Sequence, residues 1–202
     1  MRECCEGSAE VSASQRRVLG VVLAINAGMF LVECLAGLLA HSTALLADSV
    51  DMLGDAIVYG FSLYVVSRGV IWQARAALLK GLIMAGFGAV VAAEVSVKLA
   101  RGTVPSAEVM GGIGLLALLA NATCLLLLWR RRADDLNMRS AWVCSLNDVV
   151  GNAGVLLASA GVMTLQSAWP DIAVGLAIAI LFTVSAVGVL GRARRALSPS
   201  AR

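Results

Sequence analysis

Long apolar stretches alternate with short polar segments along the whole 202-residue chain. A helix needs about 20 mainly apolar residues to cross the hydrocarbon core of a bilayer. Six stretches reach that length, and we predict a transmembrane helix in each of them: 18–40, 43–66, 78–98, 108–129, 139–164 and 169–191. The pattern therefore predicts an all-α protein, an integral membrane bundle of six transmembrane helices.

The composition leads to the same fold class, because 59% of the residues are apolar and only 14% are charged. Soluble domains contain about 25% charged residues on average. The predicted spans use most of the chain and leave no water-soluble domain of useful size. We divide the chain into a flexible cytoplasmic tail with a cysteine pair (1–15), a six-helix transmembrane domain (16–191) and a short basic cytoplasmic tail (192–202).

The basic residues predict the orientation in the membrane. Of the 16 lysines and arginines, only Lys98 and Arg101 lie on one side of the predicted spans. Segments rich in Lys and Arg stay cytoplasmic, so we expect both termini, and a loop over 67–79, in the cytoplasm. The protein is then a multi-pass protein of the inner (plasma) membrane. Its partner is the lipid bilayer and not nucleic acid, because no basic patch with interleaved aromatic residues is present.

Three carboxylates lie on one face of the second predicted span. Asp48, Asp51 and Asp55 follow the spacing i, i+3, i+7 of a helix face. Each aspartate in the middle of a membrane helix costs about 2.5 to 3.5 kcal/mol on the insertion scale. No Lys or Arg lies in the middle of any predicted span, so a network of structural ion pairs has no cation to use. A bound cation, or protons in its absence, best explains this cluster.

The fifth predicted span carries a matching polar pair, Asp148 and Asn152. The run Asp148-Val-Val-Gly-Asn152-Ala resembles Asp51-Met-Leu-Gly-Asp55-Ala in the second span, which runs in the opposite direction. Such inverted echoes often mark the substrate site of a transporter. At 1.5 Å per residue, both pairs reach about the middle of the bilayer. The sequence therefore predicts four ligands for a tetrahedral divalent ion such as zinc: Asp51, Asp55, Asp148 and Asn152.

Other polar residues are candidates for the outer shell or the pathway of this site: Asp48, Asn26, Glu33 and Cys144. Asp48 lies one turn nearer the outside, and the alternative for Glu33 is contact with external water. We expect the cysteines to be reduced, because they lie in spans or in the cytoplasmic tail. Cys4 and Cys5 in that tail are candidates for metal capture. Glu94 and Lys98 are expected to form a solvated pair.

Two other classes of membrane protein remain open. A proton-coupled exporter of small organic cations also uses membrane carboxylates, but it needs an aromatic-lined cavity, and only 5% of the residues are aromatic. A membrane metal sensor without transport would rely on Cys4 and Cys5. An enzyme is not expected, because the chain has a single histidine, no cofactor motif and no plausible pair of nucleophile and base.

The first two spans resemble those of the cation diffusion facilitators in one specific run: Asn26…Glu33…Gly37…Ser42-Thr-Ala-Leu-Leu-Ala-Asp48-Ser-Val-Asp51-Met-Leu-Gly-Asp55. Asp148-x3-Asn152 falls where that family carries its second ligand pair, in the fifth of six helices. The resemblance implies a homodimeric carrier that exchanges cytoplasmic zinc or a related divalent cation for protons by alternating access. It also implies that the metal is the substrate, that no cofactor is bound, and that the four residues above are the transport-site ligands.

The sequence departs from the family pattern in three respects. Neither ligand pair contains the histidine that is typical of zinc-selective members, and the last ligand is Asn152 instead of aspartate. A site made only of oxygen ligands is harder and discriminates less between metals. We expect a short member that lacks the cytoplasmic metal-binding domain found after the sixth helix in most members, and whose dimer is held by the transmembrane helices.

Overall fold

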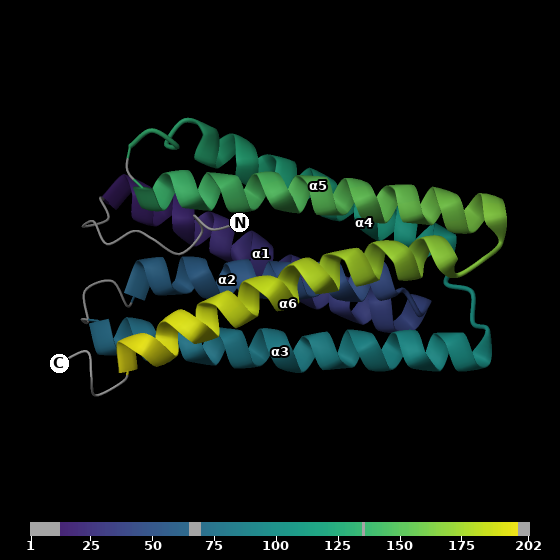
Figure 1. The fold of residues 1–202 in the computed structure, drawn as a ribbon. Coiled ribbons are helices and arrows are strands. Elements are labelled where there is room, and N and C mark those ends of the chain that lie inside the picture. Colours follow the sequence, from purple (N-terminus) through teal and green to yellow (C-terminus); the bar gives the residue numbers. More distant parts are fainter. Residues whose placement is uncertain (1–12, 65–69, 135, 198–202) are drawn as a thin grey trace.

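The computed structural model describes residues 13–64, 70–134 and 136–197, and this part of the chain is a bundle of helices without strands. Six helices run side by side along one axis (Figure 1). Their bounds are α1 Ala13–Ala40, α2 Thr43–Tyr64, α3 Val70–Arg101, α4 Ala107–Trp129, α5 Leu136–Leu165 and α6 Trp169–Leu197. The predicted fold class, an all-α bundle with six long helices, is confirmed.

The direction of the chain reverses at every connection, so α1 begins and α6 ends at the same end of the bundle (Figure 1). We call this end, which the basic residues predict to be cytoplasmic, the inner end. α2 and α5 therefore run in opposite directions, as the echo between their sequences predicted. α1, α2, α4 and α5 pack against one another, and α3 and α6 pair beside them.

Two boundaries differ from the predicted spans. The segment 67–79 was expected to join the second and third spans, and within it α3 already begins at Val70. Residues 70–80 contain no glycine or proline, and Ala and Leu, both good helix formers, make up five of these residues. α6 likewise continues to Leu197, six residues into the basic segment. Helices can extend beyond the hydrocarbon core, because water satisfies their exposed backbone ends.

Helix length and apolar composition suit a membrane. Among the described residues, three helices are long and apolar enough to cross one: α1 over Ser14–Ala40, α4 over its whole length, and α5 over Ala141–Leu165. α2 is one residue shorter than α4, and it is less apolar because it carries three aspartates. Large apolar side chains cover the outside of the bundle, Leu39 and Leu157 among them. Such a surface indicates contact with lipid or with another protein.

Buried apolar side chains fill the bundle on both sides of its middle. A cluster at the inner end includes Leu19, Tyr59 and Leu128, and a second cluster at the outer end includes Leu46, Met110 and Val162. The polar residues of α2 and α5 lie between these two clusters. The packing therefore holds the carboxylates in the middle of the bundle, away from both ends.

Candidate metal centre

The register of α2 is set at its outer end by hydrogen bonds to its first turn. Ser42 precedes the helix, and its hydroxyl accepts a hydrogen bond from the backbone N–H of Leu45 at 3.1 Å, as a helix N-cap does. Asp171 at the start of α6 accepts hydrogen bonds from the N–H groups of Thr43, at 2.8 Å, and Ala44, at 3.0 Å. Asp51 then lies eight residues into the helix, about 12 Å along its axis.

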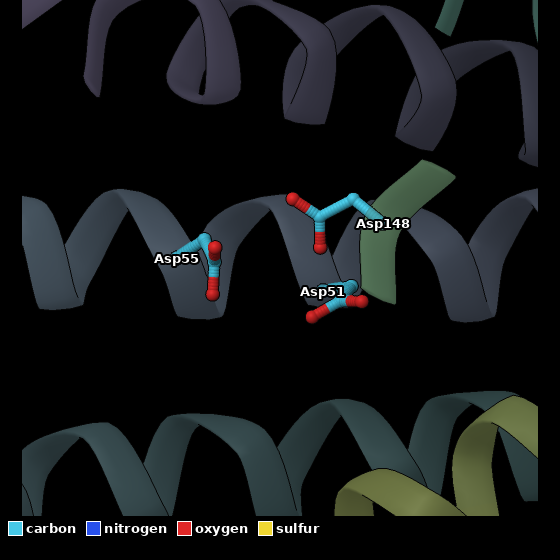
Figure 2. A group of neighbouring side chains, drawn as sticks. All are labelled: Asp51, Asp55 and Asp148. Atoms are coloured by element: carbon cyan, nitrogen blue, oxygen red, sulfur yellow. The ribbon is translucent and has the colours of Figure 1, made fainter. Parts of the chain in front are cut away.

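Three carboxylates from two antiparallel helices meet in the middle of the bundle. Asp51 and Asp55 extend from one face of α2, and Asp148 extends from α5 toward them (Figure 2). One carboxylate oxygen of each aspartate lies within 4.8 Å of those of the other two. Asp55 and Asp148 are buried and Asp51 is half-buried. The structure thus brings together the three carboxylates that the sequence predicted to meet.

Asp148 and Asn152 each have a buried side-chain oxygen that receives no hydrogen bond from the described part of the protein. Within the described part of the chain, Oδ2 of Asp148 and Oδ1 of Asn152 are buried and have no hydrogen-bond partner. The amide nitrogen of Asn152 donates to the backbone carbonyl of Asp148 at 2.8 Å, which leaves its oxygen available. Buried polar atoms are normally hydrogen-bonded. These two oxygens are therefore candidates for metal ligands.

Tyr59 holds one of the aspartates. Its hydroxyl donates to Oδ2 of Asp55 at 2.8 Å and lies 3.3 Å from the carbonyl oxygen of Ala141 on α5. The ring is fully buried in the apolar cluster at the inner end. Sequence reasoning missed Tyr59, although it lies one turn after Asp55 on the same face of the helix. This position is where a residue that orients the carboxylate would be expected.

Glu33 on α1 and Asp48 on α2 form a further group of buried carboxyl groups, beside the three-aspartate cluster. Both side chains are almost wholly buried, at 0% and 1% exposure. Their carboxyl groups lie within hydrogen-bonding reach of each other. Asp48 also faces α5, because a Cβ added at Gly151 would lie 3.2 Å from its Oδ1. The structure places Glu33 in the interior, so it is not in contact with external water.

Asn26 lies further toward the inner end. It is fully buried, and its amide donates to the carbonyl of Val22 at 2.9 Å and lies 4.0 Å from the sulfur of Cys124. Sequence reasoning missed Asn121 on α4, whose amide lies 3.6 Å from the sulfur of Met52. The rule that polar residues within a membrane span carry function would have found this residue. Both asparagines have a buried carbonyl oxygen without a donor in the described part.

None of the described cysteines belongs to the three-aspartate cluster. Cys144 lies one turn before Asp148 on α5 and is outside this cluster. Cys34 and Cys124 are free. Cys4 and Cys5 lie outside the described residues, so their predicted role in metal capture stays a prediction.

A buried ion pair at the outer end of the bundle corrects a further expectation. Lys98 is 2% exposed and pairs with Asp171, which is fully buried, so Lys98 does not form a solvated pair with Glu94. Glu94 instead lies 3.7 Å from His41, across the turn between α1 and α2. The partner of Lys98 is 73 residues away in the sequence. No local pattern could have revealed this pair.

The three-aspartate cluster has the geometry and charge of a site for one divalent cation. Metal–oxygen distances of about 2.0–2.6 Å place two ligands of one ion at most about 4–5 Å apart. The observed limit of 4.8 Å between the oxygens of Asp51, Asp55 and Asp148 is close to that range. A divalent cation would offset the mutual repulsion of the carboxylates. Hard oxygen ligands suit Mg, Ca and Mn as well as Zn.

Comparisons with known proteins indicate the family of the chain. Residues 19–198 match the family described as the cation efflux transmembrane domain. The chain is similar to the metal cation efflux system protein CzcD of Cupriavidus metallidurans and to the cation efflux system protein CzcD of an Alcaligenes strain. Each is 21% identical over 176 residues, which cover 81% of this chain and 56% of the relative. The chain thus spans about half the length of the curated relatives that it matches.

Proposed function

Because this chain belongs to the cation efflux transmembrane-domain family, we propose that it carries divalent metal cations across a membrane, out of the cytoplasm. One observation carries the proposal: three carboxylates from two antiparallel helices converge within 4.8 Å in the middle of the bundle. Members of such a family are transporters and not enzymes. Carboxylates buried in a membrane bundle typically mark the path of an ion or a proton.

We assign the ion to Asp51, Asp55 and Asp148, with Oδ1 of Asn152 as a fourth ligand. The carboxylates bind the ion from the cytoplasmic side, and their negative charge offsets its loss of water. A movement between the helices then opens the site to the outside. Tyr59 keeps Asp55 in position through its hydrogen bond of 2.8 Å. The apolar side chains around it close the inner end.

The transported ion is zinc or a related ion: cadmium, cobalt, manganese or iron. Zinc accepts four ligands in a tetrahedral arrangement, and the assigned residues offer four. All four ligand atoms are oxygens, however, and oxygen ligands select poorly between these metals. We therefore expect a broad substrate range with modest preferences.

Protons return in exchange for the metal in this proposal, and both termini face the cytoplasm of a cell whose inner membrane contains the protein. The distribution of Lys and Arg supports the orientation. Two copies form a homodimer through their transmembrane helices, an assignment that rests on the family resemblance. Chemical cross-linking in the native membrane tests it, and a chain that stays monomeric there would contradict it.

The proposal is tested with purified protein in liposomes that contain a pH-sensitive dye. Zinc, cadmium, cobalt, manganese and iron are added in turn, and the movement of protons is recorded. We expect at least one metal to move protons in wild type and none to do so in Asp51→Ala or Asp55→Ala. The matched control is Glu108→Gln, which changes an exposed carboxylate at the outer end of α4 and should transport like wild type.

The alternatives give different results in this assay. An exporter of organic cations would respond to such cations and to none of the metals. A metal sensor would bind metal and move neither metal nor protons. Metal transport that persists in Asp51→Ala would contradict the assigned site.

A further inference from the structure

The buried pair Glu33–Asp48 is not part of the metal centre and requires an explanation of its own. None of its four carboxylate oxygens accepts a hydrogen bond from a donor in the described part of the protein. Ionised carboxylates only accept hydrogen bonds. Two buried, ionised carboxylates at this separation would therefore repel each other. They can form a hydrogen bond only if one of them is protonated.

The charges around the pair do not compensate it. Glu33 has Asp48 and Asp51 as charged neighbours, both on α2. From α5, Asp148 faces Asp48 across the close approach at Gly151. All three of these neighbours are acidic. Within the described part of the chain, no ion pair involves Glu33 or Asp48.

Among the described side chains, the other helices packed against α1 and α2 bring no cation that pairs with Glu33 or Asp48. The titratable side chains of α4 are Glu108, exposed at its outer end, and Cys124, whose sulfur lies 4.0 Å from the amide of Asn26. On α3, Lys98 is bound to Thr43 of α2 and to Asp171 of α6. These statements concern the described side chains of α3 and α4 and the contact of Lys98 with α6. The pair must be neutralised by a ligand that comes from water.

A proton fits this place better than a metal ion. A divalent metal requires four or more ligands, and the pair supplies two carboxyl groups that are 0% and 1% exposed. A proton requires only two oxygens. It turns one carboxylate into a donor and the other into its acceptor, and the resulting O–H···O⁻ bond belongs to the strong, charge-assisted class.

We propose, on the premise of the transport function above, that Glu33 and Asp48 form a proton-carrying pair separate from the metal ligands. Glu33 holds the proton and donates it in a hydrogen bond to Asp48. One proton taken from external water changes the charge of the pair from −2 to −1, and its release to the cytoplasm restores −2. In this conformation the pair is closed to water.

The position of the pair explains how metal and proton could exclude each other. Asp48 is one turn from Asp51 on α2 and close to α5 at Gly151, between Asp148 and Asn152. A divalent ion at the metal centre favours the ionised form of acids near it, so it promotes release of the proton from Glu33. Departure of the metal promotes proton uptake. The coupling is electrostatic and does not require both ions to use the same oxygens.

The variant Glu33→Gln tests this pair. Glutamine has nearly the shape of protonated glutamate and can donate to Asp48, but it cannot release a proton. In liposomes with both a pH dye and a metal dye, we expect Glu33→Gln to bind metal and to move one proton fewer per metal ion than wild type. Glu108→Gln is the matched control. An unchanged ratio of protons to metal would overturn the proposal, and so would loss of metal binding.

Infrared spectroscopy of the purified protein provides a readout that does not depend on transport. A protonated carboxyl group has a C=O stretching band that a carboxylate lacks. At neutral pH and without metal, we expect the intensity of this band in Glu33→Gln to fall by one carboxyl group relative to wild type and Glu108→Gln. If that variant fails to fold, Asp48→Asn is used, and a shift of the band is expected because its hydrogen-bond acceptor is changed.

These two measurements separate failure of this inference from failure of the transport function. A band that Glu33→Gln weakens by one carboxyl group, in a protein that transports no metal, supports the proton pair and contradicts only the transport proposal. A band of unchanged intensity in Glu33→Gln overturns the proton pair even if metal transport is normal.

Discussion

Two groups of buried charged residues in this bundle differ in whether the protein supplies hydrogen-bond donors and an opposite charge to them. At the outer end, Asp171 is surrounded by donors: Lys98, the hydroxyl of Ser42, and the N–H groups of Thr43 and Ala44. In the middle of the bundle, the buried carboxylate oxygens of Glu33 and Asp48, together with Oδ2 of Asp148, have no donor among the described residues. Both groups are removed from water, but only the first is satisfied by the protein itself.

The difference separates a structural role from a functional one. Burial of a charge costs several kcal/mol unless hydrogen bonds and an opposite charge compensate it. The node around Asp171 has this compensation and joins the outer ends of α2, α3 and α6 (Figure 1). Glu33, Asp48 and Oδ2 of Asp148 have no such donor among the described residues, so we infer that ions that enter and leave compensate them. The presence of buried acids alone would not have distinguished these roles.

The largest difference should appear when one charge is removed from the middle. Asp148→Asn keeps the size of the side chain but removes an assigned ligand charge. We expect transport to fall by at least about 100-fold, more than the 10–100-fold typical of changes that act indirectly on a metal site. Thermal stability without metal should be unchanged or higher, because the variant relieves repulsion. Metal flux and thermal melting of detergent-solubilised protein measure the two effects. A variant that transports metal normally but is less stable than wild type would contradict the functional role of Asp148.

Removal of one charge at the outer end should have the opposite pattern. Lys98→Met leaves Asp171 buried without its cation, and breaking a buried pair in this way typically costs about 3–5 kcal/mol. We expect a large loss of stability, with near-normal metal affinity in the fraction that stays folded. Denaturant titration and metal binding on the same sample check both parts. Unchanged stability would show that the node is not structural.

A smaller effect is expected where α6 contacts the start of α2. A Cβ added at Gly175 would lie 2.7 Å from Cγ2 of Thr43 and 2.8 Å from its carbonyl carbon. The backbone cannot move away easily, so Gly175→Ala should destabilise the protein by about 1–3 kcal/mol. The control is Gly112→Ala, where nothing lies within 4 Å. Equal melting temperatures for the two variants would contradict the tight packing of this node.

The smallest effect is expected at Tyr59, which connects the metal centre to the inner cluster. Tyr59→Phe removes the hydrogen bond of 2.8 Å to Asp55 and keeps the ring. We expect about 0.5–1.5 kcal/mol less stability and a metal affinity about tenfold weaker. Isothermal titration with zinc measures the affinity. An unchanged affinity would mean that Tyr59 does not orient Asp55 for binding.

The sequence predicted the middle of the bundle better than its ends, for a physical reason. The three carboxylates of α2 share a face because of helix periodicity, and bilayer depth brings Asp51 and Asp55 level with Asp148. Both arguments are local or depend on a known membrane thickness. They predicted the meeting of Asp51, Asp55 and Asp148, whereas metal binding by these residues stays a prediction.

The outer node could not be predicted in this way. Lys98 and Asp171 are separated by 73 residues, and their contact depends on how α3 packs against α6. A lysine near the end of a predicted span reads as solvated, and only the tertiary structure shows it buried. The early start of α3 at Val70 was missed for a similar reason. Local composition indicates where a membrane span can lie, but not where its helix ends or what its ends contact.

Equilibrium binding of zinc to the purified protein tests the central claim most directly, because it does not depend on coupling, orientation or transport rate. Wild type, Asp148→Asn and Lys98→Met would be titrated under identical conditions, with the folded fraction of each measured first. The account predicts one ion per chain for wild type and for folded Lys98→Met, and a loss of binding in Asp148→Asn. Equal binding by wild type and Asp148→Asn would contradict the claim that the three-aspartate cluster is the metal site.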